Sequence, residues 1–580
     1  MIYTAVFFYP KWEKSGTEAT ISWDVSGYYM YLPAIFIYHD IKHCTFQEEI
    51  IKTYKPTPDF QQAFLDKTSG NYVMKYSSGQ AVLMSPYFFL ADIIANHSSK
   101  YEPNGFSYPY QMCIGLGMLM YAFIGLYFLR LVLLEYFKDK TVAILLLAYV
   151  FASNYLNYSS IDQGLTHSSL FSIYIILIYL SIKFYKSPSL KKSFFIGTLV
   201  GLATLIRPTD MLSLLIPLCW NISSIQDIRD RFSFIKKHFS LYLLSIVPFF
   251  LLAGIQPMYW KYATGNYLVY SYQDQGFSWL NPHIKKFCWS YRCGWLRYSP
   301  LFFFVIPGFY FLIKRKINSL AIVAFILIDF YIVTAWDIWD YGGTSGRAMI
   351  QCYPILAFPL AAFLEKMLER RRLQVILAVC MSFFIYMNIW WIYHLHRGTL
   401  LTSELSIEYY WRVVGRWEVD EFDVKLLDNK DSYRGHPSKY KVLYSNDFEH
   451  DSSVNITKKN GNKKIVINEV LQNTQEYMLP PLSIKDRWIR VSADITCNKK
   501  EWELWKQAQF IVDFYNDDKV VQCNMIRIHR YLKDNQSKNL FLDAIIPDKK
   551  WNRIGIKFWN AGGSNTIQID NLQVINFSDE

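Results

Sequence analysis

The chain has 580 residues, of which 52% are hydrophobic, 18% aromatic and 19% charged, which is more apolar than a soluble protein needs to fill its cores. Its net charge of +12 does not indicate nucleic-acid binding, because Lys and Arg gather in short clusters between apolar runs and act as topology signals there. The nine cysteines include no CxxC pair, so neither a zinc site nor a thioredoxin-type motif is indicated. The composition predicts a polytopic α-helical membrane protein.

The chain up to Tyr108 begins with an apolar piece for which two interpretations stay open: either the true start lies upstream, or this piece is an incomplete first span. Met1 to Pro10 is apolar but shorter than the ~20 residues that cross a bilayer, and it lacks the basic start and cleavage site of a signal peptide. Residues 11–108 are mixed and polar, with two short apolar pieces, 28–38 and 81–95, that each contain a proline. Pieces this short are typical of helices that lie along the membrane interface.

Ten apolar segments follow, and they are the predicted spans: 109–136, 141–157, 166–182, 193–206, 208–220, 239–258, 299–313, 318–336, 348–365 and 373–394. Basic clusters mark every second connection, at Lys138 and Lys140, Lys183 to Lys192, Arg229 to Lys237, Lys314 to Lys316, and Arg370 to Arg372. Because basic connections stay in the cytoplasm, residues 11–108, 158–165, 259–298, 337–347 and everything after His394 are predicted to lie outside.

The segments 193–206 and 208–220 are each too short to span comfortably, and Arg207-Pro208 lies at their junction. Proline is expected to end the first helix there. A charged residue at this depth is costly unless it faces a water-filled cavity or an anion, so Arg207 is a functional candidate. The alternative is an arginine that snorkels to the outer interface.

Hydropathy falls after Trp391, and beyond a polar connector over residues 397–440 the pattern alternates with period two. Strands are predicted at 442–444, 464–467, 488–491, 510–514, 540–542, 553–558 and 566–569. The sequence thus predicts a multi-span domain over 1–396 and a C-terminal all-β sandwich domain, of the jelly-roll kind, over 441–580. Trp551, Phe558 and Trp559 are its densest aromatic group, and they line either its core or a sugar-binding surface.

The unusual polar residues of the multi-span part all fall on the predicted outer side. Asp24 stands among aromatic residues, and its alternative role is to cap a helix that starts at Ser26 or Gly27. The other candidates are Lys75, Asp162, His167, Arg207, Tyr272, Asp274, Trp295, Arg297, Trp339, Asp340 and Arg347. Carboxylates beside aromatic rings suit sugar recognition, and Arg and Lys beside them suit a phosphate. A sugar held on a lipid phosphate needs both sets.

The chain resembles the GT-C superfamily of integral membrane glycosyltransferases, in particular the protein O-mannosyltransferase and aminoarabinose-transferase group. The resemblance covers residues 1 to about 395 and rests on Trp23-Asp24, the segment from Lys75 to Pro86, the stretch from Gly201 to Thr209, the segment from Gly294 to Pro300, and the loop from Trp339 to Arg347. Many members carry a second acid directly after the first. Val25 stands there in this chain, and Asp162 is the candidate substitute.

The resemblance implies inverting transfer of a sugar from a polyprenyl-phosphate donor to a glycan, lipid or protein acceptor, at the periplasmic face of a bacterial inner membrane. Carried over, Asp24 is the general base, and Lys75 and Arg347 contact the phosphate. Arg207 and Arg297 are further candidates for the phosphate. The candidates for binding the sugar or acceptor are Asp162, His167, Tyr272, Asp274, Trp295, Trp339 and Asp340. A divalent cation varies within the family, and nothing in the sequence fixes one.

Two other classes of function stay open. A transporter or flippase of lipid-linked glycans would show inverted repeats and polar residues at the membrane midplane, whereas here the polar residues gather at one predicted surface and no repeat is visible. A non-catalytic membrane anchor for a carbohydrate-binding domain needs one or two spans rather than about ten.

Overall fold

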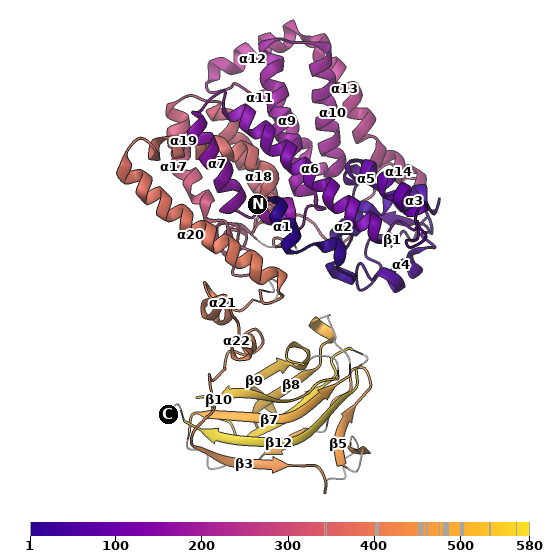
Figure 1. Ribbon diagram of the computed structural model, residues 1–580, viewed down its shortest axis with the longest axis vertical. Helices are drawn as coiled ribbons and strands as arrows, with labels where there is room; N and C mark the ends of the chain where they lie inside the picture. The colour runs from indigo at the N-terminus through magenta and orange to yellow at the C-terminus, as the bar shows by residue number, and fades with distance from the viewer. Residues whose placement is uncertain are drawn as a thin grey trace. The chain divides into compact units, whose positions relative to one another are not determined.

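The computed structural model describes residues 2–341, 343, 345–400, 405–450, 456–459, 462–474, 476–479, 486–498, 504–532, 535–563 and 565–578. These residues form two compact units, Met1–Arg397 and Gly398–Glu580. The first unit is mainly helical and the second is mainly β-sheet (Figure 1).

Short elements form the beginning of the first unit. They are α1 (Ile2–Phe8), α2 (Trp23–Tyr29), α3 (Tyr31–Phe36), α4 (Gln47–Tyr54), the antiparallel hairpin β1 (Ala63–Leu65) and β2 (Tyr72–Met74), and α5 (Gly79–Asn96). The two apolar pieces predicted at 28–38 and 81–95 therefore lie within α2, α3 and α5. Buried apolar side chains line one side of α5, including Met84, Phe88 and Ala91, so this helix packs against its neighbours.

Longer helices follow. They are α6 (Tyr108–Leu133), α7 (Asp139–Phe151), α8 (Tyr155–Ser160), α9 (Thr166–Lys186), α10 (Leu190–Ile206), α11 (Leu215–Cys219), α12 (Ile225–Lys237), α13 (Phe239–Ala253), α14 (Ile255–Thr264), α15 (Ile284–Trp289), α16 (Trp295–Tyr298), α17 (Val305–Lys314), α18 (Ser319–Ala335), α19 (Tyr353–Met367) and α20 (Arg371–His396). Three 3-10 helices extend them, at Pro208–Leu214, Pro300–Phe304 and Arg347–Cys352. In the bundle, α6 packs along α9 and α10 along α13 (Figure 1).

In the described part of the chain, five helical segments are long and apolar enough to cross a membrane: Tyr108–Leu133, Thr166–Lys186, Phe239–Thr264, Arg347–Met367 and Arg371–His396. The expected break at Arg207-Pro208 is confirmed, because α10 ends at Ile206. The predicted span 141–157 is wrong in its second half, where α7 stops at Phe151. The backbone N–H of Asn154 instead donates to the Ser299 hydroxyl, 3.1 Å away, and its side chain donates to the Ser345 carbonyl, 2.8 Å away.

The second unit is an antiparallel sandwich. Its strands are β3 (Tyr440–Asn446), β4 (Ile456–Lys459), β5 (Asn462–Ile467), β6 (Tyr477–Leu479), β7 (Trp488–Cys497), β8 (Gln509–Asn516), β9 (Lys519–Arg527), β10 (Ser537–Ile545), β11 (Arg553–Trp559) and β12 (Ile567–Phe577). One sheet has the order β10-β7-β12-β5-β4, with β3 also paired to β12, and the other has the order β6-β11-β8-β9. Alternate side chains of β7 and β12 share one buried core with those of β8 and β11. Phe558 belongs to that core, and Trp551 packs against it.

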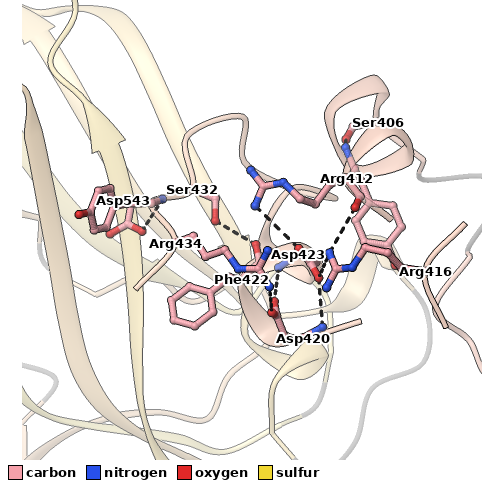
Figure 2. Close-up of polar contacts among 11 residues, drawn as sticks. Ser406, Arg412, Arg416, Asp420, Phe422, Asp423, Ser432, Arg434 and Asp543 are labelled. Carbon is pink, nitrogen blue, oxygen red and sulfur yellow. Dashed lines mark hydrogen bonds and ion pairs between the residues drawn. The ribbon is translucent and has the colours of Figure 1, made fainter. Parts of the chain in front are cut away.

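The described residues between Leu405 and Tyr440 fold back onto the sandwich through two short helices, α21 (Ile407–Val413) and α22 (Glu421–Lys425). Asp423 of α22 is buried and forms ion pairs with Arg416, at 3.0 Å, and with Arg412, at 3.8 Å (Figure 2). Farther along, Asn429 donates to the Asp543 carbonyl of β10 at 2.6 Å. This segment is therefore tied to the sheet by polar contacts within the second unit.

Candidate active site

Asp24 lies in the first turn of α2, close to the surface of the first unit. The helix begins at Trp23, and its N-cap residue Ser22 makes no capping hydrogen bond with its side chain. Asp24 does not cap a helix that begins at Ser26 or Gly27, so that alternative role is wrong. Trp23 has a φ of 47°, which is unusual for a residue with a side chain, and the residue is 48% exposed. The backbone thus holds an exposed aromatic ring directly beside this carboxylate.

The carboxylate of Asp24 has two partners from distant parts of the chain. Its Oδ2 accepts from Nη2 of Arg347 at 2.6 Å, and its Oδ1 accepts from the Tyr76 hydroxyl at 2.7 Å. Burial alone would raise the pKa of Asp24, but the charge of Arg347, the hydrogen bond from Tyr76 and the charge of Lys75 outweigh burial and lower it. Asp24 is therefore ionised at neutral pH.

Tyr76 approaches α2 because residue 27 is glycine. A Cβ atom at Gly27 would lie 2.4 Å from Cδ2 of Tyr76, which is closer than real carbon atoms pack. The neighbouring residue, Lys75, follows β2, and its ammonium lies 5.6 Å from the centre of the Tyr76 ring. The segment after β2 thus places both the Tyr76 hydroxyl and the Lys75 ammonium near Asp24.

A second close approach brings Arg207 to the same place. Gly79, at the start of α5, has no side chain, and a Cβ there would lie 2.3 Å from the backbone nitrogen of Ile206. The segment that carries Lys75 therefore lies against the end of α10, next to Arg207. The charge of Arg207 acts on the Tyr28 hydroxyl, so the two groups lie near each other, and Tyr28 lies four residues after Asp24, on the same face of α2.

The structure therefore brings Asp24 together with Arg347 and Lys75. Arg207 lies near Arg347 and Tyr28, and it also interacts with a second, buried acid, Asp210. The Arg347 side chain is only 11% exposed, and its Nε is buried without a hydrogen-bond partner among the described residues. Tyr272 adds an aromatic wall, because its ring makes edge contacts with Tyr76 at 6.0 Å and with Trp336 at 5.3 Å. An excess of positive charge beside aromatic rings suits an anionic ligand that also carries a ring to stack.

Two of the other candidates lie close by but have structural partners. Asp162 forms an ion pair with Lys11 at 2.9 Å and accepts from the Asn157 amide at 2.8 Å. Burial would raise the pKa of Asp162, but the nearby charges, led by Lys11, lower it to about 2. His167 is fully buried at the start of α9, and its Nδ1 lies 3.3 Å from the Gln351 side-chain oxygen.

The remaining candidates lie in the loops after α14 and α18. Trp295 is buried, donates from its indole to the Tyr353 hydroxyl at 3.2 Å and packs its ring against Phe302 at 5.2 Å, so it contributes to packing. Arg297 lies in the short helix α16, and Trp339, Asp340 and Asp274 lie in the loops themselves. Arg297 covers the Tyr291 ring at 3.9 Å, Lys286 lies 5.8 Å from the Trp339 ring, Asp340 is half-buried, and Asp274 is exposed.

Tyr76 and Tyr28 were not predicted from the sequence. Tyr28 could have been predicted, because a residue four positions after Asp24 on a helix lies on the same face as Asp24. For Tyr76 the only indication in the sequence was its position next to Lys75, because its contact with Asp24 joins residues that are 52 positions apart in the chain.

The side chains do not fit a divalent metal. Among the described residues, no group of three His, Cys, Asp or Glu side chains is placed to hold a metal ion, and the acid at the centre of the site faces cations instead.

Two cavities lie elsewhere in the first unit. One, of about 270 Å³, is apolar and lies between α11, α12 and α18. The other, of about 570 Å³, lies at the ends of α6, α17 and α19.

Comparison with known proteins yields a weak likeness in structure. No family model matches the chain, and no curated protein matches it in sequence. The cryo-EM structure of the arabinosyltransferase EmbB from Mycobacterium smegmatis aligns with a TM-score of 0.29 and 11% identity, over 85% of this chain and 59% of that one. The chain thus spans about 59% of the length of that enzyme. A TM-score this low is not evidence of a shared fold or activity, so the site itself has to carry any functional conclusion.

Proposed function

We propose that the chain transfers a sugar from a polyprenyl-phosphate donor to an acceptor hydroxyl at the outer face of a membrane, with inversion at the anomeric carbon. The observation that carries the proposal is the group formed by Asp24, Arg347, Lys75 and Arg207. Asp24 is ionised and faces Arg347 and Lys75, and Arg207 lies nearby beside Asp210, so the group suits a reaction that needs one base and one phosphate site.

The three cations are assigned to the donor phosphate. A phosphodiester that loses its sugar becomes a dianion, so positive charge stabilises the leaving group more strongly in the transition state than in the bound donor. Arg207 and Arg347 offer planar pairs of N–H donors that match phosphate oxygens, and Lys75 adds a point charge. The unpaired Nε of Arg347 is one donor available for this purpose.

Asp24 is assigned as the base. It takes the proton of the acceptor hydroxyl while the acceptor oxygen bonds to the anomeric carbon, and the bond from that carbon to the phosphate oxygen breaks with its electron pair leaving on the phosphate. Asp24 is paired with Arg347 in this structure. A donor phosphate competes for the same guanidinium, so donor binding would release the carboxylate and return its pKa toward the ordinary range.

Aromatic side chains around the acid are assigned to the sugar. Trp23 is exposed beside Asp24, and Tyr272 packs against Tyr76. Such rings can stack on the faces of pyranoses and hold the anomeric carbon near the base. The five apolar helical segments support a membrane location, with a bacterial inner membrane and a periplasmic active site as the specific proposal. The sandwich is proposed as a carbohydrate-binding jelly roll that presents the acceptor.

The test is to incubate purified full-length protein in detergent with a panel of polyprenyl-phosphate sugars and an acceptor mixture, and to detect polyprenyl phosphate as product. We expect turnover with one donor and none with the matching nucleotide sugar. Asp24→Asn should abolish this turnover, whereas Asp59→Asn, which alters an exposed acid of the same outer segment, should not. Turnover by Asp24→Asn at the wild-type rate would remove the assigned base, and turnover from the nucleotide sugar alone would remove the lipid donor.

A further inference from the structure

The cavity of about 570 Å³ at the ends of α6, α17 and α19 has no part in the proposed reaction. Its lining includes Leu134 and Lys138 after α6, Phe311 and Lys314 of α17, and Glu365 and Glu369 near the end of α19. The basic connections predicted to face the cytoplasm include Lys138 and Lys314, so the cavity lies at the predicted cytoplasmic ends of these helices.

The cavity contains more cationic side chains than its two carboxylates can pair with. Arg315 is paired with Glu365, and Lys366 is paired with Glu369 at 2.5 Å. The carboxylate of Glu365 also accepts from the backbone N–H of Lys138 at 3.2 Å. In the part of the chain that the structure describes, neither the Lys138 nor the Lys314 ammonium takes part in an ion pair. Both carboxylates are therefore occupied, while two cations remain available to a ligand.

The cavity also has an apolar side. Phe137 is buried beneath the Arg315 guanidinium, which lies 5.1 Å from the centre of its ring, and Leu134 and Phe311 are half-buried beside it. A free phosphate ion would gain nothing from these side chains, whereas a phospholipid places its phosphate next to its acyl chains. A cavity of this size is also within the range of about 300–1,000 Å³ that is typical of sites for small organic ligands.

We propose that this cavity binds the headgroup of an anionic phospholipid from the leaflet that faces the basic connections. The Lys138 and Lys314 ammonium groups contact the phosphate, and Leu134 and Phe311 contact the upper part of the acyl chains. Basic pockets between membrane helices on the cytoplasmic side are a recurring way of binding such lipids. This inference requires that the helices lie in a membrane but does not depend on the proposed sugar transfer.

A simpler explanation is that these lysines stabilise helix ends, since cations near a helix C-terminus are favourable. The control therefore has to remove lysines in comparable positions that do not line the cavity. Lys314 lies in the last turn of α17, and Lys237 lies in the last turn of α12. Lys140 is exposed in the first turn of α7, two residues after Lys138. Lys140→Gln/Lys237→Gln therefore removes the same charge from the same side of the bundle without touching the cavity.

The experiment measures binding of phosphatidylglycerol and of phosphatidylcholine to delipidated full-length protein by native mass spectrometry. Wild type should prefer phosphatidylglycerol. Each lysine near a membrane surface contributes about five-fold to the binding of anionic lipid, so Lys138→Gln/Lys314→Gln should lose about 25-fold in affinity for it. The matched control should keep wild-type affinity, and each single variant should lose about five-fold, which provides a second reading if the double variant does not fold.

Three outcomes would overturn the proposal. One is wild-type protein that shows no preference for phosphatidylglycerol. Another is an equal loss of affinity in the Lys140→Gln/Lys237→Gln control, which would mean that the lipid responds to overall surface charge. The last is displacement of the bound lipid by millimolar inorganic phosphate, which would identify a site for free phosphate rather than for lipid.

Discussion

Replacing Asp24 by asparagine is expected to change turnover and donor-site affinity in opposite directions. In the structure the Asp24 carboxylate occupies Arg347 at 2.6 Å, and these side chains are 29% and 11% exposed. Asparagine keeps the shape of the side chain but removes the charge. It therefore removes the proposed base and also frees the guanidinium to bind a phosphate without first breaking an ion pair.

The expected changes in affinity for polyprenyl phosphate and in kcat can both be worked out from the structure. A hydrogen bond between charged groups contributes about 1.5–3 kcal/mol. Because Asp24 is partly exposed, the lower end applies, and the affinity for polyprenyl phosphate should rise about ten-fold. Loss of a positioned base should lower kcat by about 10²–10⁴.

The affinity is measured by isothermal titration calorimetry with polyprenyl phosphate that carries no sugar, and kcat is measured with the donor identified from the panel. Asp59→Asn serves as the control, and it should leave both quantities unchanged. An Asp24→Asn protein that binds polyprenyl phosphate no more tightly than wild type would refute the competition for Arg347. An unchanged kcat would refute the role of Asp24 as base.

Three further predictions concern other parts of the chain. Arg207→Ala should weaken the binding of polyprenyl phosphate about ten-fold in the same titration, since a charged hydrogen-bond donor is lost, and unchanged affinity would favour an arginine that only reaches the interface. Gly79→Val should lower both the melting temperature and turnover, because its side chain would collide with the backbone at Ile206, and a wild-type melting curve would contradict this close approach. Lys425 is buried, its ammonium has no hydrogen-bond partner among the described residues, and burial lowers its pKa from 10.5 to about 7. The unfolded chain then binds more protons, so stability should rise between about pH 7 and pH 10, and Lys425→Met should remove that rise in thermal melts at pH 7 and pH 9.

The positions of the long helices could be predicted because each rests on a long apolar run. The exception at 141–157 has a local cause. Ser153 and Asn154 lie inside the apolar run, and both are buried. The Ser153 hydroxyl donates to the Tyr149 carbonyl of α7 itself, and Asn154 makes hydrogen bonds with Ser299 and Ser345 of other segments. Hydropathy averaged over a window does not register two polar side chains, but their hydrogen bonds are what redirect the backbone after Phe151.

The strands of the sandwich show where the alternation of apolar and polar residues stops predicting a strand. Every strand predicted from period two overlaps a strand of the structure, whereas β4, β6 and β9 were missed. Each of these three is at the edge of its sheet. Edge strands bury less of their surface and carry more polar residues, so the alternation that identifies central strands is weaker there. In β9, for example, Val520 is 43% exposed.

Two outer acids show why a candidate site cannot be completed from sequence. Asp24 and Asp162 are both acids on the predicted outer side, and each meets a cation from a distant segment, across 323 and 151 residues of chain. The Lys11 ammonium neutralises Asp162 directly, and the Asn157 amide occupies its other oxygen. Around Asp24, glycines at 27 and 79 let further segments approach, so that positive charge exceeds negative charge. The difference between an acid that holds the fold together and one available to a substrate thus depends on steric gaps between distant segments, which no local pattern encodes.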